Sequence, residues 1–169
     1  VAGIAGTVLA VVVGPELLIV GAASLVAGWA YTGGPKPYGY LGLGEVFVFI
    51  FFGVVATVGT TYVLTENISA VSLAASVSVG LWATALLVIN NLRDIPGDTR
   101  AGKQTMAVRI GEKRTRITYV LMQELALTGA VVLTVFSDRW AVAALAGVPF
   151  VIQGIRAVAS TAVPLACSI

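Results

Sequence analysis

The sequence predicts an all-α protein in which membrane-spanning helices form a bundle. Of its 169 residues, 58% are hydrophobic and only 11% are charged, whereas soluble domains carry about 25% charged residues. The mean hydropathy is +0.97, and the apolar runs are too long and alternate too little for the strands of an outer-membrane barrel. This composition excludes a soluble domain and a disordered chain. We therefore expect the lipid bilayer, and no nucleic acid, as a partner.

Six apolar segments are expected to be helices of a single transmembrane domain over residues 1–169. The third and fourth, at 22 residues each, are long enough to cross a hydrocarbon core of about 30 Å. The first begins abruptly and is followed by five others, so we expect a truncated first helix and a chain that is a piece of a longer protein. The six segments are Val1–Val13, Leu17–Tyr31, Leu43–Leu64, Ile68–Ile89, Ile117–Phe136 and Trp140–Ile155.

Capping residues and prolines set the expected helix boundaries. Pro15 and Glu16 suit the first turn of the second helix, where proline is tolerated and an acid meets the positive end of the helix dipole. Asn67 and Asp138 occupy positions where N-caps are expected. Pro96 disfavours helical geometry at the preceding residue, so the fourth helix is expected to end near Asp94.

The basic residues are distributed asymmetrically between the two ends of the expected helices. The segment 91–116 carries seven basic residues against three acidic ones, and nine of the ten basic residues fall on the same side of the bundle. Only Arg139 falls on the other side. By the positive-inside rule, the loops 32–42 and 91–116 are expected to be cytoplasmic, which implies a multi-pass protein of the inner (plasma) membrane.

A cluster of carboxylates, amides and cations follows the fourth apolar segment. Asn90 and Asp94 lie four residues apart on one helix face, and Asp98 follows the Pro-Gly pair. Two carboxylates beside the amides of Asn90 and Asn91 suit Mg²⁺, which prefers oxygen ligands and substrate phosphates. Three neighbouring cations match a phosphate leaving group; they are Arg93, Arg100 and Lys103. The alternative is a solvated loop whose arginines set topology and whose aspartates cap helices.

The second informative segment runs from Tyr31 to Glu45 and is rich in glycine, proline and tyrosine. Such a shaped loop at the membrane surface is tolerated where it lines a cavity. An aromatic belt at the interface is the simpler interpretation, but it does not account for the glycines and prolines. The candidate acceptor-binding residues of this loop are Tyr31, Lys36, Tyr38, Tyr40 and Glu45.

These two segments carry a resemblance to a known family. The first reads Tyr-Thr-Gly-Gly-Pro-Lys-Pro-Tyr-Gly-Tyr-Leu-Gly-Leu-Gly-Glu over 31–45, and the second reads Asn-Asn-Leu-Arg-Asp-Ile-Pro-Gly-Asp-Thr-Arg-Ala-Gly-Lys over 90–103. Together they resemble the UbiA-type intramembrane aromatic prenyltransferases, in particular the branch that acts on 1,4-dihydroxy-2-naphthoate in menaquinone synthesis. The family is expected to have nine helices and two Asp-rich motifs. Asp94 and Asp98 match the second motif, and nothing in this chain matches the first.

The resemblance implies an activity and a set of roles. A polyprenyl chain would be transferred from polyprenyl diphosphate to 1,4-dihydroxy-2-naphthoate with Mg²⁺ as cofactor, giving demethylmenaquinone, CO2 and diphosphate. Asp94 and Asp98 would be the catalytic, metal-binding pair with Asn90 as a further metal ligand. The residues implied to bind diphosphate are Asn91, Arg93, Arg100 and Lys103. Without the first motif and the last helix, the chain alone is expected to be inactive.

Two other functions remain open on sequence grounds. A sister enzyme acting on homogentisate, 4-hydroxybenzoate or haem would keep the Asp pair but would not need the glycine–tyrosine loop. A membrane transporter with a cation site would need acids deeper in several spans, and Glu124 is the one candidate. The prediction for Glu124 is an interhelical hydrogen bond, because it lies beside Gln123 near the cytoplasmic end. Arg109 is expected on a short surface helix that mainly sets topology.

Overall fold

The computed structural model describes residues 2–35, 37–136 and 147–160, which form helices and the connections between them. In chain order the elements are α1 (Ala2–Val12), α2 (Glu16–Thr32), the 3₁₀ helix η1 (Tyr38–Leu41), α3 (Gly44–Val48), the π-helical segment η2 (Phe49–Val55), α4 (Ala56–Thr65), α5 (Ala70–Arg100), α6 (Met106–Phe136) and α7 (Val148–Ser160). No strand occurs in these ranges. The predicted all-α class is confirmed.

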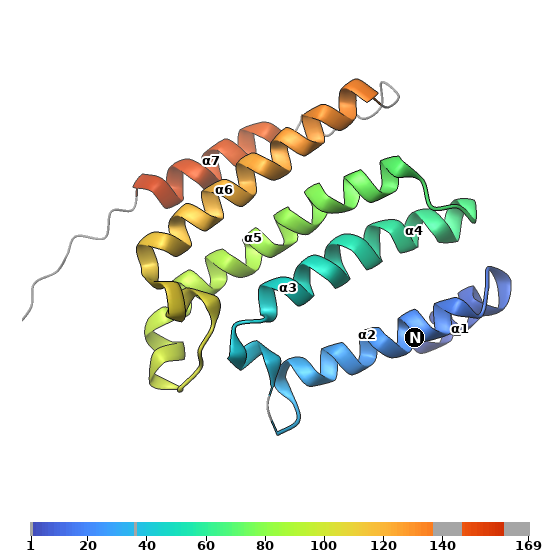
Figure 1. Ribbon diagram of the computed structural model, residues 1–169, viewed down its shortest axis with the longest axis horizontal. Helices are drawn as coiled ribbons and strands as arrows, with labels where there is room; N and C mark the ends of the chain where they lie inside the picture. The colour runs from blue at the N-terminus through green and yellow to red at the C-terminus, as the bar shows by residue number, and fades with distance from the viewer. Residues whose placement is uncertain (1, 36, 137–146, 161–169) are drawn as a thin grey trace, which may run out of the picture.

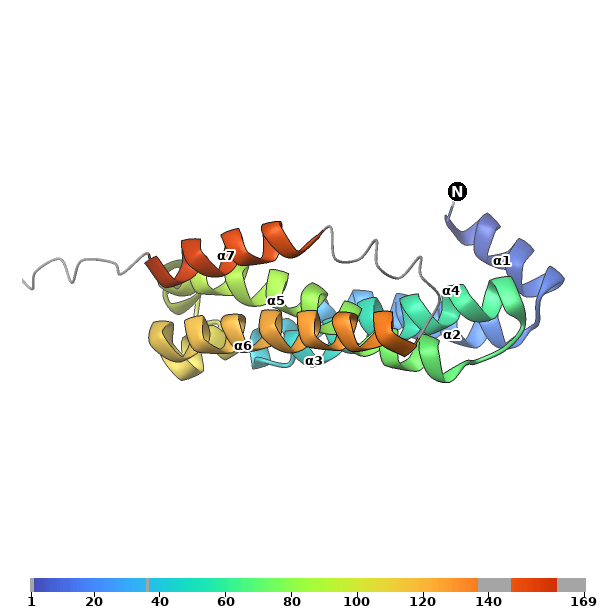
Figure 2. The ribbon, with the colours of Figure 1, turned by 90° about the horizontal axis from the view of Figure 1, so that it is seen from above.

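The long helices lie side by side in one layer, with α1 and α7 on one side of it (Figures 1 and 2). Helices α3 and α4 and the π-helical segment between them follow one another without a break, so that Gly44–Thr65 is one apolar stretch. This stretch, α5 and most of α6 are each long and apolar enough to cross a membrane. The chain is thus an integral membrane protein.

Contacts between small residues hold the middle of the layer together. Helix α5 packs most extensively against α6, where Ala85 and Val88 meet Tyr119. On its other face α5 meets η2, and a Cβ added to Gly53 would lie 2.5 Å from the Cα of Gly80. Close backbone approach of this kind is what small residues allow between membrane helices, where packing drives association.

The predicted end of the fourth helix is wrong. Helix α5 continues through Pro96 to Arg100, although proline removes one backbone hydrogen bond and crowds the preceding turn. The Thr99 hydroxyl donates to the carbonyl of Ile95 within this last turn, and the long contact with α6 supports the helix as a whole. The segment 91–116 is therefore helical except for the connection 101–105 and a kink at Gly111.

Other predicted boundaries also change. Ser69, not Asn67, caps α5, because its side chain accepts a hydrogen bond from the Ser72 amide. Helix α6 begins at Met106, and Gly111 (φ 78°, ψ 167°) kinks it after one turn, which confirms the short helix expected after Lys103. Of the sixth predicted helix, residues 140–146 and the cap Asp138 lie outside the described residues, while α7 extends past Ile155.

Candidate metal and diphosphate site

The Asp-rich segment and the glycine–tyrosine loop line one cavity. It has a volume of about 380 Å³ and lies at the end of the layer where the connections 33–43 and 101–105 meet (Figure 1). Helix α5 contributes the two carboxylates one turn apart, and the tyrosines come from α2 and η1. The lining consists of Tyr31, Thr32, Gly39, Tyr40, Leu87, Asn90, Asn91, Arg93, Asp94, Asp98, Lys103 and Thr105.

The two aspartates have different surroundings. Asp98 is buried, with 8% of its surface exposed, and its Oδ1 lies 3.2 Å from Lys103 Nζ. The Asp94 carboxylate is half exposed and pairs with the neighbouring guanidinium of Arg93 at 2.8 Å. The hydrogen bond and the charge of Asp98 raise the pKa of Lys103 above its ordinary value, so Lys103 keeps its positive charge at physiological pH.

A hydrogen bond and a ring contact join the two segments, which lie some sixty residues apart in the sequence. The amide of Gln104 donates to the carbonyl of Tyr40 at 3.0 Å. The ammonium of Lys103 lies 5.1 Å from the centre of the Tyr40 ring, within range of a cation–π attraction. Gly42 has a positive φ of 72°, and a Cβ there would be 2.9 Å from the Gln104 carbonyl oxygen. The tyrosine loop is therefore fitted directly onto the connection after α5.

A second, apolar cavity of about 570 Å³ adjoins the first, and Tyr31 lines both. Tyr38 stacks on Phe47 with ring centres 3.8 Å apart, and its hydroxyl donates to the carbonyl of Ala27. Burial raises the pKa of Tyr38, which is thus a neutral hydrogen-bond donor. The remaining lining comes mainly from α2, α3 and η2, namely Ser24, Ala27, Gly28, Gly44, Val48, Phe51, Phe52 and Ala56.

Several residues proposed from the sequence lie outside these cavities. Glu45 is buried in the first turn of α3 and lines neither of them. Arg100 is exposed at the end of α5, and Arg109 donates to the carbonyl of Gln104. Lys36 lies outside the described residues. Glu124 is exposed on α6, and no hydrogen bond joins it to another helix in the described part of the chain.

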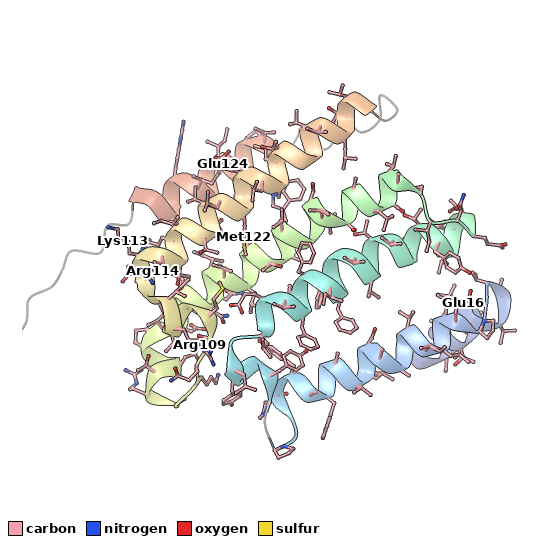
Figure 3. The ribbon with its side chains drawn as sticks, viewed as in Figure 1. Glu16, Arg109, Lys113, Arg114, Met122 and Glu124 are labelled. Atoms are coloured by element: carbon pink, nitrogen blue, oxygen red, sulfur yellow. The ribbon has the colours of Figure 1, made fainter. Side chains whose placement is uncertain are left out.

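The charged side chains are concentrated at one end of the molecule. Arg109, Lys113 and Arg114 all lie near the kinked start of α6, at the end that holds the cavity (Figure 3). Glu16 lies at the opposite end (Figure 3), where it accepts a hydrogen bond from the Tyr62 hydroxyl. The cavity therefore lies in the basic end of the helical layer.

The donor set of the cavity fits a hard divalent cation. Carboxylate and amide oxygens are the ligands that Mg²⁺ takes, and it commonly uses one or two carboxylates together with substrate phosphates. Asp94 and Asp98 provide those carboxylates from adjacent turns of one helix. No third acidic, histidine or cysteine side chain joins them within the described ranges, which leaves amide oxygens, water and substrate phosphates as the further ligands. Lys103 and Arg93 are placed to meet such a phosphate.

The aromatic wall of the apolar cavity was not predicted from the sequence. Phe47 and Phe51 are four residues apart and stack with ring centres at 6.2 Å, and Phe52 also reaches the cavity. The spacing of the aromatic residues in this run was the available signal. The segment is hydrophobic throughout, so its sequence does not distinguish cavity-lining positions from lipid-facing ones.

Fold and cavity together define an integral membrane protein with an oxygen-rich, cation-flanked site at one end of its helices. The family model described as the UbiA prenyltransferase family matches residues 1–162. The chain belongs to this family.

Similar proteins include two named 1,4-dihydroxy-2-naphthoate octaprenyltransferase. The one from Mycobacterium tuberculosis is 44% identical over 89% of this chain and 51% of its own length. The one from Mycobacterium leprae is 42% identical over 95% of this chain and 54% of its own length. A 2-carboxy-1,4-naphthoquinone phytyltransferase from Synechocystis is 31% identical over 83% of this chain and 46% of its own length. The chain spans about half the length of the curated relatives it matches. No solved structure matches it.

Proposed function

We propose that the whole protein transfers a polyprenyl chain from polyprenyl diphosphate to 1,4-dihydroxy-2-naphthoate. The observation that carries the proposal is the junction of two cavities at Tyr31, one lined by carboxylates and cations and the other by aromatic rings. A polyprenyl diphosphate has these same two parts, a charged head and an apolar tail. The names of the similar proteins from both mycobacteria support the naphthoate as acceptor.

The proposal gives a task in this reaction to the carboxylates, the Asn90 amide and the cations of the polar cavity. Asp94, Asp98 and Asn90 would hold Mg²⁺, and Asn91 lies beside them. Prenyltransferases of this family generally use a divalent metal. Bound Mg²⁺ would neutralise the diphosphate and make it a better leaving group. Arg93 and Lys103 would stabilise the negative charge that grows on the diphosphate as the allylic C–O bond breaks.

The tyrosine loop and the aromatic cavity would handle the carbon skeletons. The tail would lie among the phenylalanines of the apolar cavity, which excludes water from the allylic cation. Tyr40, exposed at the mouth of the polar cavity, offers a face on which a bicyclic ring can stack. Attack of the ring carbon on the cation, followed by loss of CO2, gives demethylmenaquinol, the reduced form of demethylmenaquinone. We place this site on the cytoplasmic side of the inner membrane, following the positive-inside rule.

A transfer assay tests the proposal. The whole protein, purified in detergent, is incubated with a polyprenyl diphosphate and Mg²⁺ and with one of three acceptors: 1,4-dihydroxy-2-naphthoate, 4-hydroxybenzoate or homogentisate. We expect a prenylated and decarboxylated product from the naphthoate, at a kcat/KM at least 100-fold above that of the other acceptors. Equal use of 4-hydroxybenzoate would support prenyltransferase activity but contradict the naphthoate as the specific acceptor. The absence of product with all three acceptors would contradict the proposed prenyltransferase activity.

Aspartate variants test the assigned roles. In the whole protein, Asp94→Ala and Asp98→Ala are expected to abolish transfer while the protein still inserts into membranes. Chelation of Mg²⁺ should reproduce the loss in the wild type. Turnover close to the wild-type rate in both variants would contradict the assignment.

A further inference from the structure

Glu45 is a buried carboxylate with no contact to either cavity. It lies in the first turn of α3 with 6% of its surface exposed. The positive end of a helix dipole stabilises an acid there, but a buried carboxylate remains costly unless it is hydrogen-bonded. Because Glu45 lines neither cavity, it cannot touch a substrate held in them. Its burial therefore requires a different explanation.

The hydrogen bond of Glu45 leads to the polar cavity through Asn91. Glu45 Oε1 accepts from Nδ2 of Asn91 at 2.9 Å, and Asn91 lines the cavity beside the aspartates. Because Nδ2 is the donor, the NH2 group of Asn91 turns toward Glu45. The carbonyl oxygen of Asn91 is the amide atom left for the cavity.

The second carboxylate oxygen of Glu45 supports a role beyond packing. Oε2 is buried and has no hydrogen-bond partner among the described residues. The nearby hydroxyl of Thr84 donates to the carbonyl of Gly80 at 2.7 Å and lies 3.5 Å from the backbone carbonyl of Glu45, so it does not satisfy the carboxylate. Most buried polar atoms in native structures are hydrogen-bonded, so an unsatisfied carboxylate oxygen of this kind calls for an explanation.

We infer that Glu45 is a positioning residue that orients the Asn91 amide so that its oxygen faces the metal and diphosphate. This inference rests on the proposed function and changes the role of Asn91 from a diphosphate donor to a metal-side acceptor. By accepting a hydrogen bond from the NH2 group, the carboxylate polarises the Asn91 amide and increases the negative charge on its oxygen, as outer-shell partners of metal ligands do. Since Glu45 opens α3 directly after the tyrosine loop, the pair also ties that loop to the Asp-rich helix.

Mn²⁺ binding to the whole protein provides a readout apart from turnover. Free Mn²⁺ is measured by electron paramagnetic resonance in the presence of inorganic diphosphate. Glu45→Gln keeps the volume but replaces the carboxylate by an amide that can either donate to Asn91 or accept from it, so the orientation of Asn91 is no longer enforced. We expect Mn²⁺ affinity to fall about 10-fold, the lower end for lost outer-shell partners. In an Asn91→Ala background the same change should have no further effect, since contacting residues are non-additive when one acts through the other.

Two further variants keep the inference open to refutation if Glu45→Gln folds poorly. Thr84→Val alters a buried neighbour of the Glu45 backbone without touching the carboxylate, and it should bind Mn²⁺ as the wild type does. Asn91→Ala removes the amide oxygen itself and leaves Glu45 in place. It should lower Mn²⁺ affinity about 10-fold, as Glu45→Gln does, and an affinity equal to that of the wild type would overturn the inference.

The possible failures are distinguishable. A wild-type protein that neither binds Mn²⁺ with diphosphate nor transfers a prenyl group overturns the proposed function, and this inference falls with it. A wild type that does both overturns the inference alone under either of two results. One is an unchanged Mn²⁺ affinity in Glu45→Gln. The other is that Glu45→Gln lowers Mn²⁺ affinity by the same factor in the wild-type and in the Asn91→Ala background.

Discussion

Two glycines at the site have the same backbone conformation but different surroundings, and they allow the fit of the tyrosine loop to be measured. Gly42 has a φ of 72° and Gly102 a φ of 71°. A Cβ at Gly42 would lie 2.9 Å from the Gln104 carbonyl oxygen, whereas a Cβ at Gly102 would meet nothing within 4 Å. Replacing each by alanine therefore separates the backbone cost from the cost of the contact.

The magnitudes follow from these two environments. Alanine in the left-handed region costs about 1–2 kcal/mol, and this is the whole expected effect of Gly102→Ala. In Gly42→Ala an overpacking cost of about 1–3 kcal/mol is added, because the neighbouring atom is rigid backbone. Relief of that clash moves the tyrosine loop away from the connection 101–105. We therefore expect weaker substrate binding in Gly42→Ala only.

Thermal unfolding and steady-state kinetics of the whole protein measure both effects. We expect Gly42→Ala to lower the unfolding temperature more than Gly102→Ala does, because the overpacking cost is added to the backbone cost. Its KM for the aromatic acceptor should rise about 10-fold, corresponding to about 1.4 kcal/mol of lost binding, while Gly102→Ala keeps the wild-type KM. Identical unfolding temperatures and KM values for the two variants would refute the proposed contact between the loops.

Three other predictions concern packing and topology. Gly53→Ala should destabilise the protein by more than 2 kcal/mol, because its Cβ would meet the facing helix backbone, whereas Gly59→Ala, with open space around it, should be neutral or stabilising in thermal unfolding. Tyr38→Phe loses one hydrogen bond and should cost about 1 kcal/mol, measured in the same way, with the KM for polyprenyl diphosphate unchanged; a large KM effect would contradict a supporting role. In a cysteine-free background, Pro35→Cys should be labelled by a membrane-impermeant reagent from the cytoplasmic side and Asn67→Cys from the other side, and labelling of both from one side would refute the orientation.

The helical class and the convergence of two distant segments were predictable from the sequence. The length and hydropathy of the apolar runs were enough to predict the helical class, because lipid imposes helices on apolar runs of this length. The meeting of the Tyr31–Glu45 loop with Asp94 and Asp98 followed from the number of spans between them, which returns the chain to the same side. The structure brings these segments into one cavity.

Other features depend on tertiary contacts that local rules do not contain. The continuation of α5 through Pro96 is one, since contact with α6 outweighs the local preference. The burial of Glu45 is another: its place at a helix start was readable, but its partner Asn91 lies 46 positions away. The π-helical segment between α3 and α4 has no signal in hydropathy at all, because an apolar run supports either helix type.

The central claim is that Asp94 and Asp98 bind a divalent metal together with the diphosphate of a prenyl donor. Binding of a polyprenyl diphosphate to the whole protein, measured by calorimetry with and without Mg²⁺, tests this claim most directly. We predict Mg²⁺-dependent binding that is lost in Asp94→Asn and in Asp98→Asn. The Mg²⁺-dependent binding should be kept in Glu112→Gln, because the Glu112 carboxylate pairs with Arg116 and does not line the cavity. Binding that needs no Mg²⁺, or that survives both aspartate substitutions, would contradict the account.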